Sequence, residues 1–397
     1  MTRTSPGPAT ALLTAPFRLF FLLAAVHAAA AMAVWIGQLT GSLTLPLAWA
    51  GPSWHAHEML FGTLPAALAG FLLTAMANWT GTPPLSGRPL AALALLWAAG
   101  RLGLWFSGGA LPVLVAVVDM AFPLSLGIYA TSVLVRQGHY RSLLLMAAVA
   151  ALAGASLSSH LGNTGVLPGA AGYAQELALS AALTLMVIIG GRITPAFTNN
   201  WLQRQGRPPA ARAHPALERL VLGSTLALLA ASLLALPEPW VAPLALLAAV
   251  ANAARLVGWS GWQARSEPLL WILHLGYGWI VLAMALRGAT PLLDALSASA
   301  WLHATGAGAM GTLILAVATR VALGHTGRTL SLSAGGVVIY LLILGAGLVR
   351  TAVAVLPGVP YREGLMLAAG GWIGAFLLYA LLYGPILARP RPDGRPG

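Results

Sequence analysis

The 397-residue sequence contains no cysteine. Without thiolate ligands the chain cannot hold an iron–sulfur cluster, a covalently attached c-type haem or a thiolate copper centre, and it cannot form disulfides. Any haem is therefore expected to be a b-type haem, held without covalent attachment and ligated by histidine. Any copper must take its ligands from histidine, methionine or oxygen atoms.

Lysine is also absent, because all 21 basic residues are arginines. A Schiff base to retinal or pyridoxal phosphate needs a lysine amine, so both cofactors are excluded. Charged residues make up only 8% of the chain, against about 25% in a typical soluble domain. Because 58% of the residues are hydrophobic and the mean hydropathy is +0.82, the sequence predicts an all-α polytopic membrane protein in a lipid bilayer.

Apolar runs of about 20 residues, the length that crosses a bilayer, predict twelve transmembrane helices. They lie near residues 17–39, 55–77, 89–107, 110–134, 141–160, 172–196, 215–236, 239–259, 268–286, 300–324, 331–355 and 363–386. No cleavable signal peptide is expected, because the polar start at residues 1–14 leads directly into a full-length span.

The arginines predict how the chain is oriented. Seventeen of them lie near the N-terminus, in even-numbered loops or near the C-terminus, whereas the odd-numbered loops contain only Arg287, Arg350 and Arg362. Because basic residues stay on the cytoplasmic side, both termini are expected in the cytoplasm. The same placement explains the net charge of +12 without nucleic acid as a partner.

We expect a single membrane domain over residues 1–397, with its core at 16–388 and a disordered basic tail at 389–397. Spans two, six and ten each begin with polar residues at the predicted outer face and end in a turn rich in Gly, Thr, Asn or Arg. This pattern suggests three repeats of a four-helix unit, although Gly and Thr are common in such turns.

Polar residues inside the predicted spans fall into layers. Charged groups at mid-bilayer cost at least about 2.5–3.5 kcal/mol each and usually mark a functional interior. The outer layer contains eight of these residues: His55, His57, Glu58, Arg101, Asp119, His160, Glu176 and His303. One shared polar pocket facing the periplasm would explain this layer, and the alternative is a set of independent hydrogen bonds between helices.

His55 and His57 cannot face one ligand centre on a regular helix, because positions i and i+2 point about 200° apart. Either His55 precedes the helix, or the two imidazoles serve two different centres. Glu58 shares a helix face with His55 and is expected to bind a metal or to orient an imidazole. The alternative is a polar capping cluster at the start of the helix.

His303 is followed by small residues at 304–311, which either permit close helix packing or leave room for a haem. Shared depth makes His55, His57 and His303 the predicted metal ligands. His274, with Gly278 one turn away, is a further candidate ligand, as is His325, although His325 also fits a helix-terminal turn near lipid phosphates.

The inner layer also contains two arginines, Arg192 and Arg320, which we expect to help bind a cofactor. Gly190, Gly191 and Pro195 are expected to break the end of span six, so that Arg192 can contact a cofactor propionate. A plain helix terminus is the alternative.

Several longer segments resemble the NnrS family. They are residues 16–21, 54–62 (Trp-His-Ala-His-Glu-Met-Leu-Phe-Gly), 78–81, 84–87, 190–198, 273–279 and 319–328 (Thr-Arg-Val-Ala-Leu-Gly-His-Thr-Gly-Arg). The resemblance runs in sequence order from residue 16 to about residue 330. It implies an inner-membrane protein with haem and copper that is associated with nitric oxide, nitrosative stress and denitrification.

Three functions are compatible with this resemblance. A nitric oxide reductase would need electrons from quinol or another donor, and Glu58, Asp119 and Glu176 would relay its protons. A non-enzymatic protein would instead bind or sense nitric oxide, haem or copper. The third function is a twelve-span transporter, although two six-helix halves are not evident. For Asp119, pairing with Arg101 would make the carboxylate purely structural.

Overall fold

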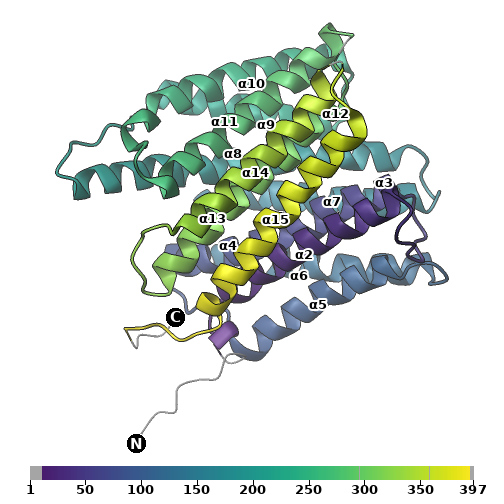
Figure 1. Cartoon of the computed structure of the whole chain (residues 1–397), viewed down its shortest axis with the longest axis horizontal. Coiled ribbons are helices and arrows are strands. Elements are labelled where there is room, and N and C mark those ends of the chain that lie inside the picture. The colour runs from purple at the N-terminus through teal and green to yellow at the C-terminus, as the bar shows by residue number, and fades with distance from the viewer. Residues whose placement is uncertain (1–10, 295, 357, 394–397) are drawn as a thin grey trace, which may run out of the picture. The chain divides into compact units, whose positions relative to one another are not determined.

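The computed structural model describes residues 11–294, 296–356 and 358–393 (Figure 1). Within these residues the fold consists of helices and contains no strand, so the prediction of an all-α polytopic membrane protein is confirmed. The last four residues of the predicted basic tail, 394–397, lie outside the described residues.

The first six spans contain the following helices: α2 (Pro16–Leu39), α3 (Gly51–His57), the π-helix η1 (Glu58–Thr63), α4 (Leu64–Thr80), α5 (Gly87–Trp105), α6 (Pro112–Arg136), η2 (Tyr140–Ser142), α7 (Leu143–Asn163) and α8 (Ala170–Arg204). The remaining spans contain α9 (Pro215–Leu233), α10 (Glu238–Gly258), η3 (Gly261–Ala264), α11 (Pro268–Ala289), η4 (Thr290–Leu292), α12 (Ser299–His303), the π-helix η5 (Ala304–Met310), α13 (Gly311–His325), α14 (Ala334–Val355) and α15 (Tyr361–Leu387).

Each of the twelve predicted spans corresponds to a helix or to a continuous run of helical segments. Among the described residues, eleven of these runs are also long and apolar enough to cross a membrane, and α5 is the exception. Span six differs from its prediction, because α8 continues through Pro195 to Arg204. Pro195 removes one backbone N–H from the ladder, but a single lost hydrogen bond does not end this helix.

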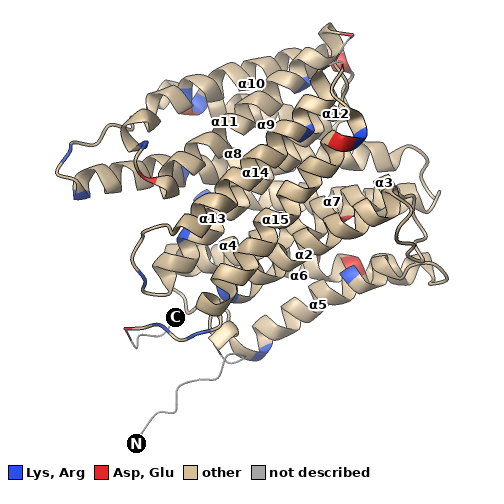
Figure 2. Ribbon diagram, in the orientation of Figure 1, with Lys and Arg blue, Asp and Glu red and all other residues tan. Residues whose placement is uncertain are grey.

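Contacts divide the chain into two compact units. The first unit consists of Met1–Gln175, Ala318–Ser331 and Phe376–Gly397, and it includes α2 to α7. The second consists of Glu176–Val317 and Leu332–Ala375, and it includes α9 to α12 and α14. Charged residues are sparse along the helices of both units (Figure 2).

A buried arginine of the first unit binds the C-terminal end of α15. Arg18 is 1% exposed, and its Nη1 donates to the carbonyl oxygens of Leu387 (2.7 Å) and Arg389 (2.8 Å). The last carbonyls of a helix have no donor within the helix, so Arg18 satisfies the end of α15. Farther along the tail, Arg391 donates to the carbonyl of His325 (3.0 Å) and pairs with Asp393.

The three most buried spans are Gly51–Thr80, Ala170–Arg204 and Ser299–His325. They are spans two, six and ten, for which the sequence shows similar polar starts. Two of the three also contain a π-helix, η1 or η5, directly after a histidine. The three-fold repeat itself stays a prediction.

Candidate metal centre

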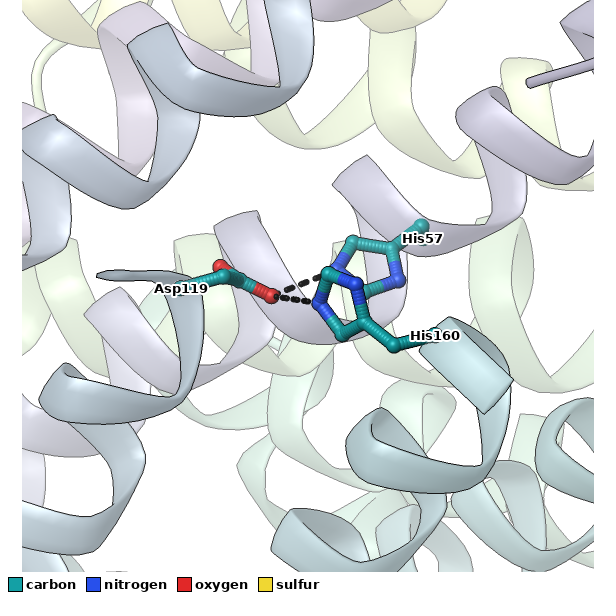
Figure 3. Close-up of side chains that lie close together, drawn as sticks. All are labelled: His57, Asp119 and His160. Atoms are coloured by element: carbon teal, nitrogen blue, oxygen red, sulfur yellow. Dashed lines mark hydrogen bonds and ion pairs between the residues drawn. The ribbon is translucent and has the colours of Figure 1, made fainter. Parts of the chain in front are cut away.

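Three buried side chains of the first unit, His57, Asp119 and His160, meet at one point (Figure 3). Asp119 Oδ2 lies 2.9 Å from His57 Nε2 and 2.8 Å from His160 Nε2. The three candidate ligand atoms all lie within 4.8 Å of one another. We call these three residues the histidine–aspartate centre.

A π-helical turn brings His57 and its neighbour into the interior together. His57 is the last residue of α3 and Glu58 is the first of η1, and they are 1% and 0% exposed. A π-helical turn accommodates an extra residue and is frequent at functional sites. The wider turn lets two adjacent polar side chains be buried at the start of a membrane span.

Asp119 reaches the centre because α5 and α6 approach closely. A Cβ atom on Gly100 of α5 would lie 2.8 Å from Asp119 Oδ1 and 3.0 Å from Asp119 Cα, so only glycine fits there without displacement. Within α6, Pro123 stands four residues after Asp119 and has no N–H to donate to the Asp119 carbonyl. The helix is therefore one backbone hydrogen bond weaker at the aspartate.

A buried arginine joins the histidine–aspartate centre to Glu58. Arg101 Nη1 donates to Glu58 Oε1 at 2.9 Å, and Nη2 donates to Asp119 Oδ1. Arg101 is 6% exposed, and both carboxylates are less exposed than that. This pairing explains how an arginine can lie inside α5, because a buried charge needs a partner of opposite sign.

Glu58 accepts further hydrogen bonds through Oε2. His27 Nε2 lies 2.7 Å from this oxygen, and Trp105 Nε1 donates to it at 3.0 Å. Two carboxylates and one guanidinium leave a net charge of −1 when the imidazoles are neutral. A bound cation would balance this buried charge.

Aromatic rings enclose the centre. Trp49, from the segment before α3, packs edge-on against His57 and His160, with ring centroids 4.9 and 5.0 Å apart. Phe61 lies 4.7 Å from the His57 ring on another side. Because these apolar rings exclude water, electrostatic interactions within the centre are stronger than they would be in water.

The residues of the centre fit a metal ion. With metal–ligand bonds of about 2.0–2.1 Å, two ligands of a tetrahedral ion lie about 3.3 Å apart, so the observed ligand separations need to open only slightly. Imidazole with a carboxylate and no thiolate suits copper, zinc or non-haem iron. With an ion at Nε2 of His57, Nδ1–H can donate to Ser159 Oγ, 3.2 Å away, and fix the tautomer.

His303 lies in the second unit. Its Nδ1 is 2.8 Å from the carbonyl oxygen of Ser299, which can only accept, so Nδ1 carries the proton and Nε2 has the lone pair. This is the usual orientation of a metal-binding histidine. However, tryptophan rings pack against two of the small residues after His303. A Cβ atom on Gly308 would collide with Trp279, and one on Gly311 would collide with Trp372. His303 Nε2 could thus hold a metal, but there is no gap for a haem at Gly308 or Gly311, and only Gly306 has open space beside it.

His274 is enclosed by its own unit. The Thr198 hydroxyl donates to the Thr194 carbonyl, so it accepts from His274 Nε2 at 3.0 Å. Nδ1 then has the lone pair, and a Cβ on Gly261 would lie 2.6 Å from it. Nδ1 is buried without a hydrogen-bond partner among the described residues, and Gly261 lies beside it, so the ligand role of His274 stays a prediction.

The other predicted site residues have different surroundings. In the first unit the His55 ring stacks on Trp35 at 5.0 Å, and the His325 ring lies 5.4 Å from Phe17. Arg320 of the same unit is half-buried. In the second unit Arg192 is exposed, and the exposed Glu176 pairs with Arg287 at 3.3 Å.

The Gly190–Gly191 pair, predicted to loosen α8, instead makes room for a buried arginine. A Cβ on Gly191 would collide with the guanidinium of Arg255, and one on Gly190 would lie 3.1 Å from Tyr277. Arg255 pairs with Glu218 and donates to Tyr277 Oη at 3.0 Å. These glycines therefore serve packing within the second unit.

The histidine–aspartate centre, Glu58, Arg101 and His27 together form one polar cluster. Three of its residues, His27, Arg101 and His160, were not predicted as ligands or catalytic groups. For Arg101 and His160 the available signal was their depth, since both belong to the outer layer of polar residues. For His27 the sequence gives no sign that the side chain faces Glu58.

Comparison with known proteins agrees with the resemblance seen in the sequence. A family model described as NnrS protein matches residues 11–391, nearly the whole chain and well beyond residue 330. No curated protein matches the chain.

Proposed function

Because the chain belongs to the NnrS family, we propose that it binds copper at the histidine–aspartate centre and removes nitric oxide there. Family membership and the apolar helices indicate a multi-pass membrane protein of the nitric oxide response. The proposal adds the metal, its ligands and the reaction. The observation that carries it is the convergence of His57, Asp119 and His160 in a buried, thiolate-free cluster.

Charge favours copper over a divalent ion without redox chemistry. The surrounding cluster has a net charge of −1 with neutral imidazoles, which a cuprous ion neutralises and a divalent ion over-compensates. Copper also binds readily to imidazole nitrogen. A b-type haem, which the family resemblance implies, would be held by His303 Nε2. Tryptophan rings occupy the space beside Gly308 and Gly311, whereas the space beside Gly306 is open.

The proposed reaction is reduction of two nitric oxide molecules to nitrous oxide and water, which consumes two electrons and two protons. Bound copper would supply a redox centre that binds nitric oxide, with a quinol as the expected electron donor. Glu58 and Asp119 supply proton-accepting oxygens, and Arg101 holds both carboxylates in place. His27, between Glu58 and Thr63 Oγ1 (2.9 Å), can pass a proton between its two ring nitrogens.

The first test of this proposal is the metal content of purified variants. Replacing His57 or His160 with Ala should abolish copper binding, and His214→Ala is the control because His214 is exposed in the loop before α9. Loss of a direct ligand should weaken copper affinity by more than the about 10- to 100-fold that is typical of outer-shell changes. Full copper occupancy in both variants would rule out this centre.

The second test separates an enzyme from a binder. Anaerobic protein with quinol and nitric oxide should release nitrous oxide steadily, and Glu58→Gln should slow the release per bound copper ion. Stoichiometric uptake of nitric oxide without release of nitrous oxide, with every donor class supplied, would reject reduction and leave a nitric oxide-binding protein.

We also propose that the protein lies in a bacterial cytoplasmic membrane, with both termini in the cytoplasm.

A further inference from the structure

A small cavity lies beside the histidine–aspartate centre in the first unit. Its volume is about 10 Å³, and Asp119 forms part of its wall. A cavity of this size holds about one water-sized guest. Except for Asp119 and Ser156, the lining side chains are apolar, and they come from η1, α4, α6 and α7.

One polar atom in this wall lacks a hydrogen bond. The Ser156 Oγ is buried and has no hydrogen-bond partner among the described residues, although serines in helices commonly donate to a carbonyl in the preceding turn. An unsatisfied buried hydroxyl costs about 1–3 kcal/mol. The Ser156 hydroxyl is therefore available to a guest molecule in the cavity.

The cavity wall reaches the outside of the first unit. Pro123 and Ala153, on α6 and α7, are half-buried, whereas Phe61 and Leu152 on the inner side are buried. Both helices are long and apolar enough to cross a membrane, so the half-buried residues of this wall are expected to face lipid tails. An ion would lose its hydration there, and a water molecule would find only the Asp119 carboxylate and the Ser156 hydroxyl, the lower end of the two to four polar partners that it needs. An uncharged gas needs no such partners.

We propose that this cavity is the docking site for a small neutral diatomic gas, which reaches the metal centre from the lipid between α6 and α7. Its role as the nitric oxide subsite rests on the proposed function, whereas occupancy by a neutral gas does not. The Ser156 hydroxyl gives the guest one hydrogen bond, and Asp119 separates it from the imidazoles of His57 and His160.

The test uses dissolved oxygen as a paramagnetic diatomic probe, with metal-free protein in lipid nanodiscs. Methyl NMR signals of Val149 and Leu152, which line the cavity, should relax faster under oxygen than those of Leu73, which is equally buried elsewhere. Ala153→Trp should remove this difference by filling the mouth, and Ala153→Leu should reduce it. Ala151→Trp is the control, since Ala151 is half-buried on the same helix but does not line the cavity.

Equal relaxation at Val149, Leu152 and Leu73 in the unaltered protein would overturn the proposal, as would equal loss in the Ala151 and Ala153 variants. With copper bound, Ala153→Trp should also slow nitric oxide uptake relative to Ala151→Trp, at unchanged copper content. Oxygen-sensitive relaxation in a protein that binds no copper would support the gas site and reject the proposed function, so the two failures are distinguishable.

Discussion

At the scale of single residues, Arg101 carries the charge balance of the polar cluster. Its guanidinium is the partner of both Glu58 and Asp119. Removing one member of a buried ion pair typically costs about 3–5 kcal/mol, because the remaining charge stays buried. Arg101→Met should therefore lower thermal stability strongly, as measured by size-exclusion chromatography after heating. Arg88→Met, at an exposed position of the same helix, should have little effect, and equal losses in the two variants would contradict this role.

Gly62 is a second position at which a single substitution should disturb the polar cluster. A Cβ there would lie 2.6 Å from His27 Cε1 and 3.1 Å from Arg101 Nη1. Overpacking of this kind costs about 1–3 kcal/mol, so Gly62→Ala should lower both the thermal midpoint and copper occupancy. Gly127→Ala, on the open side of α6, has no neighbour within 4 Å and should leave both unchanged. If the two variants behave alike, the close approach at Gly62 is not important.

Residue chemistry and depth could be predicted from the sequence, but partners could not. His57, Glu58 and Asp119 were expected at one depth, and the structure brings them together. Depth alone could not distinguish them from Glu176, which is exposed and pairs with Arg287. Rotation about each helix axis decides which side chains meet, and it depends on contacts such as Gly100 against Asp119 that no local pattern reveals.

At the scale of helical elements, the two π-helices are the features that could not be predicted from the sequence. Span boundaries followed from apolar run lengths, but a regular helix of 3.6 residues per turn placed His55 and His57 on opposite faces. In the structure His55 stacks on Trp35 while His57 binds Asp119, and η1 then adds Glu58 to the interior. A single extra residue in a helical turn has no signature in hydropathy.

Intrahelical prolines give a prediction at this scale. Pro123→Ala should add the hydrogen bond from residue 123 to the Asp119 carbonyl, and Pro195→Ala should do the same for Gly191 in α8. Each restored bond is worth about 0.5–1.5 kcal/mol, so both variants should be more stable. Only Pro123→Ala should change copper affinity, because it alone tightens the backbone that carries a proposed ligand. Copper titrations of the two variants decide this, and an equal effect on affinity would count against the helix-loosening role.

At the scale of the whole molecule, the number of membrane spans depends on whether α5 crosses the bilayer. Eleven spans satisfy length and hydropathy among the described residues, and α5 is left out because Arg88 and Arg101 lower its mean hydropathy. Eleven spans would put the two termini on opposite sides of the membrane, and twelve would put them on the same side. Arg101 is neutralised by Glu58 and Asp119, so the charge that lowers the hydropathy of α5 does not face lipid.

We therefore predict twelve spans with both termini in the cytoplasm, in line with the arginines at the even-numbered loops. Green fluorescent protein fused after residue 389 should fluoresce, because it folds in the cytoplasm, and alkaline phosphatase at the same place should be inactive. Alkaline phosphatase inserted after Gly109, in the loop between α5 and α6, should be active because that loop is predicted to be periplasmic. Active phosphatase after residue 389 together with a fluorescent N-terminal fusion would mean eleven spans, and α5 would then have to be buried without crossing the bilayer.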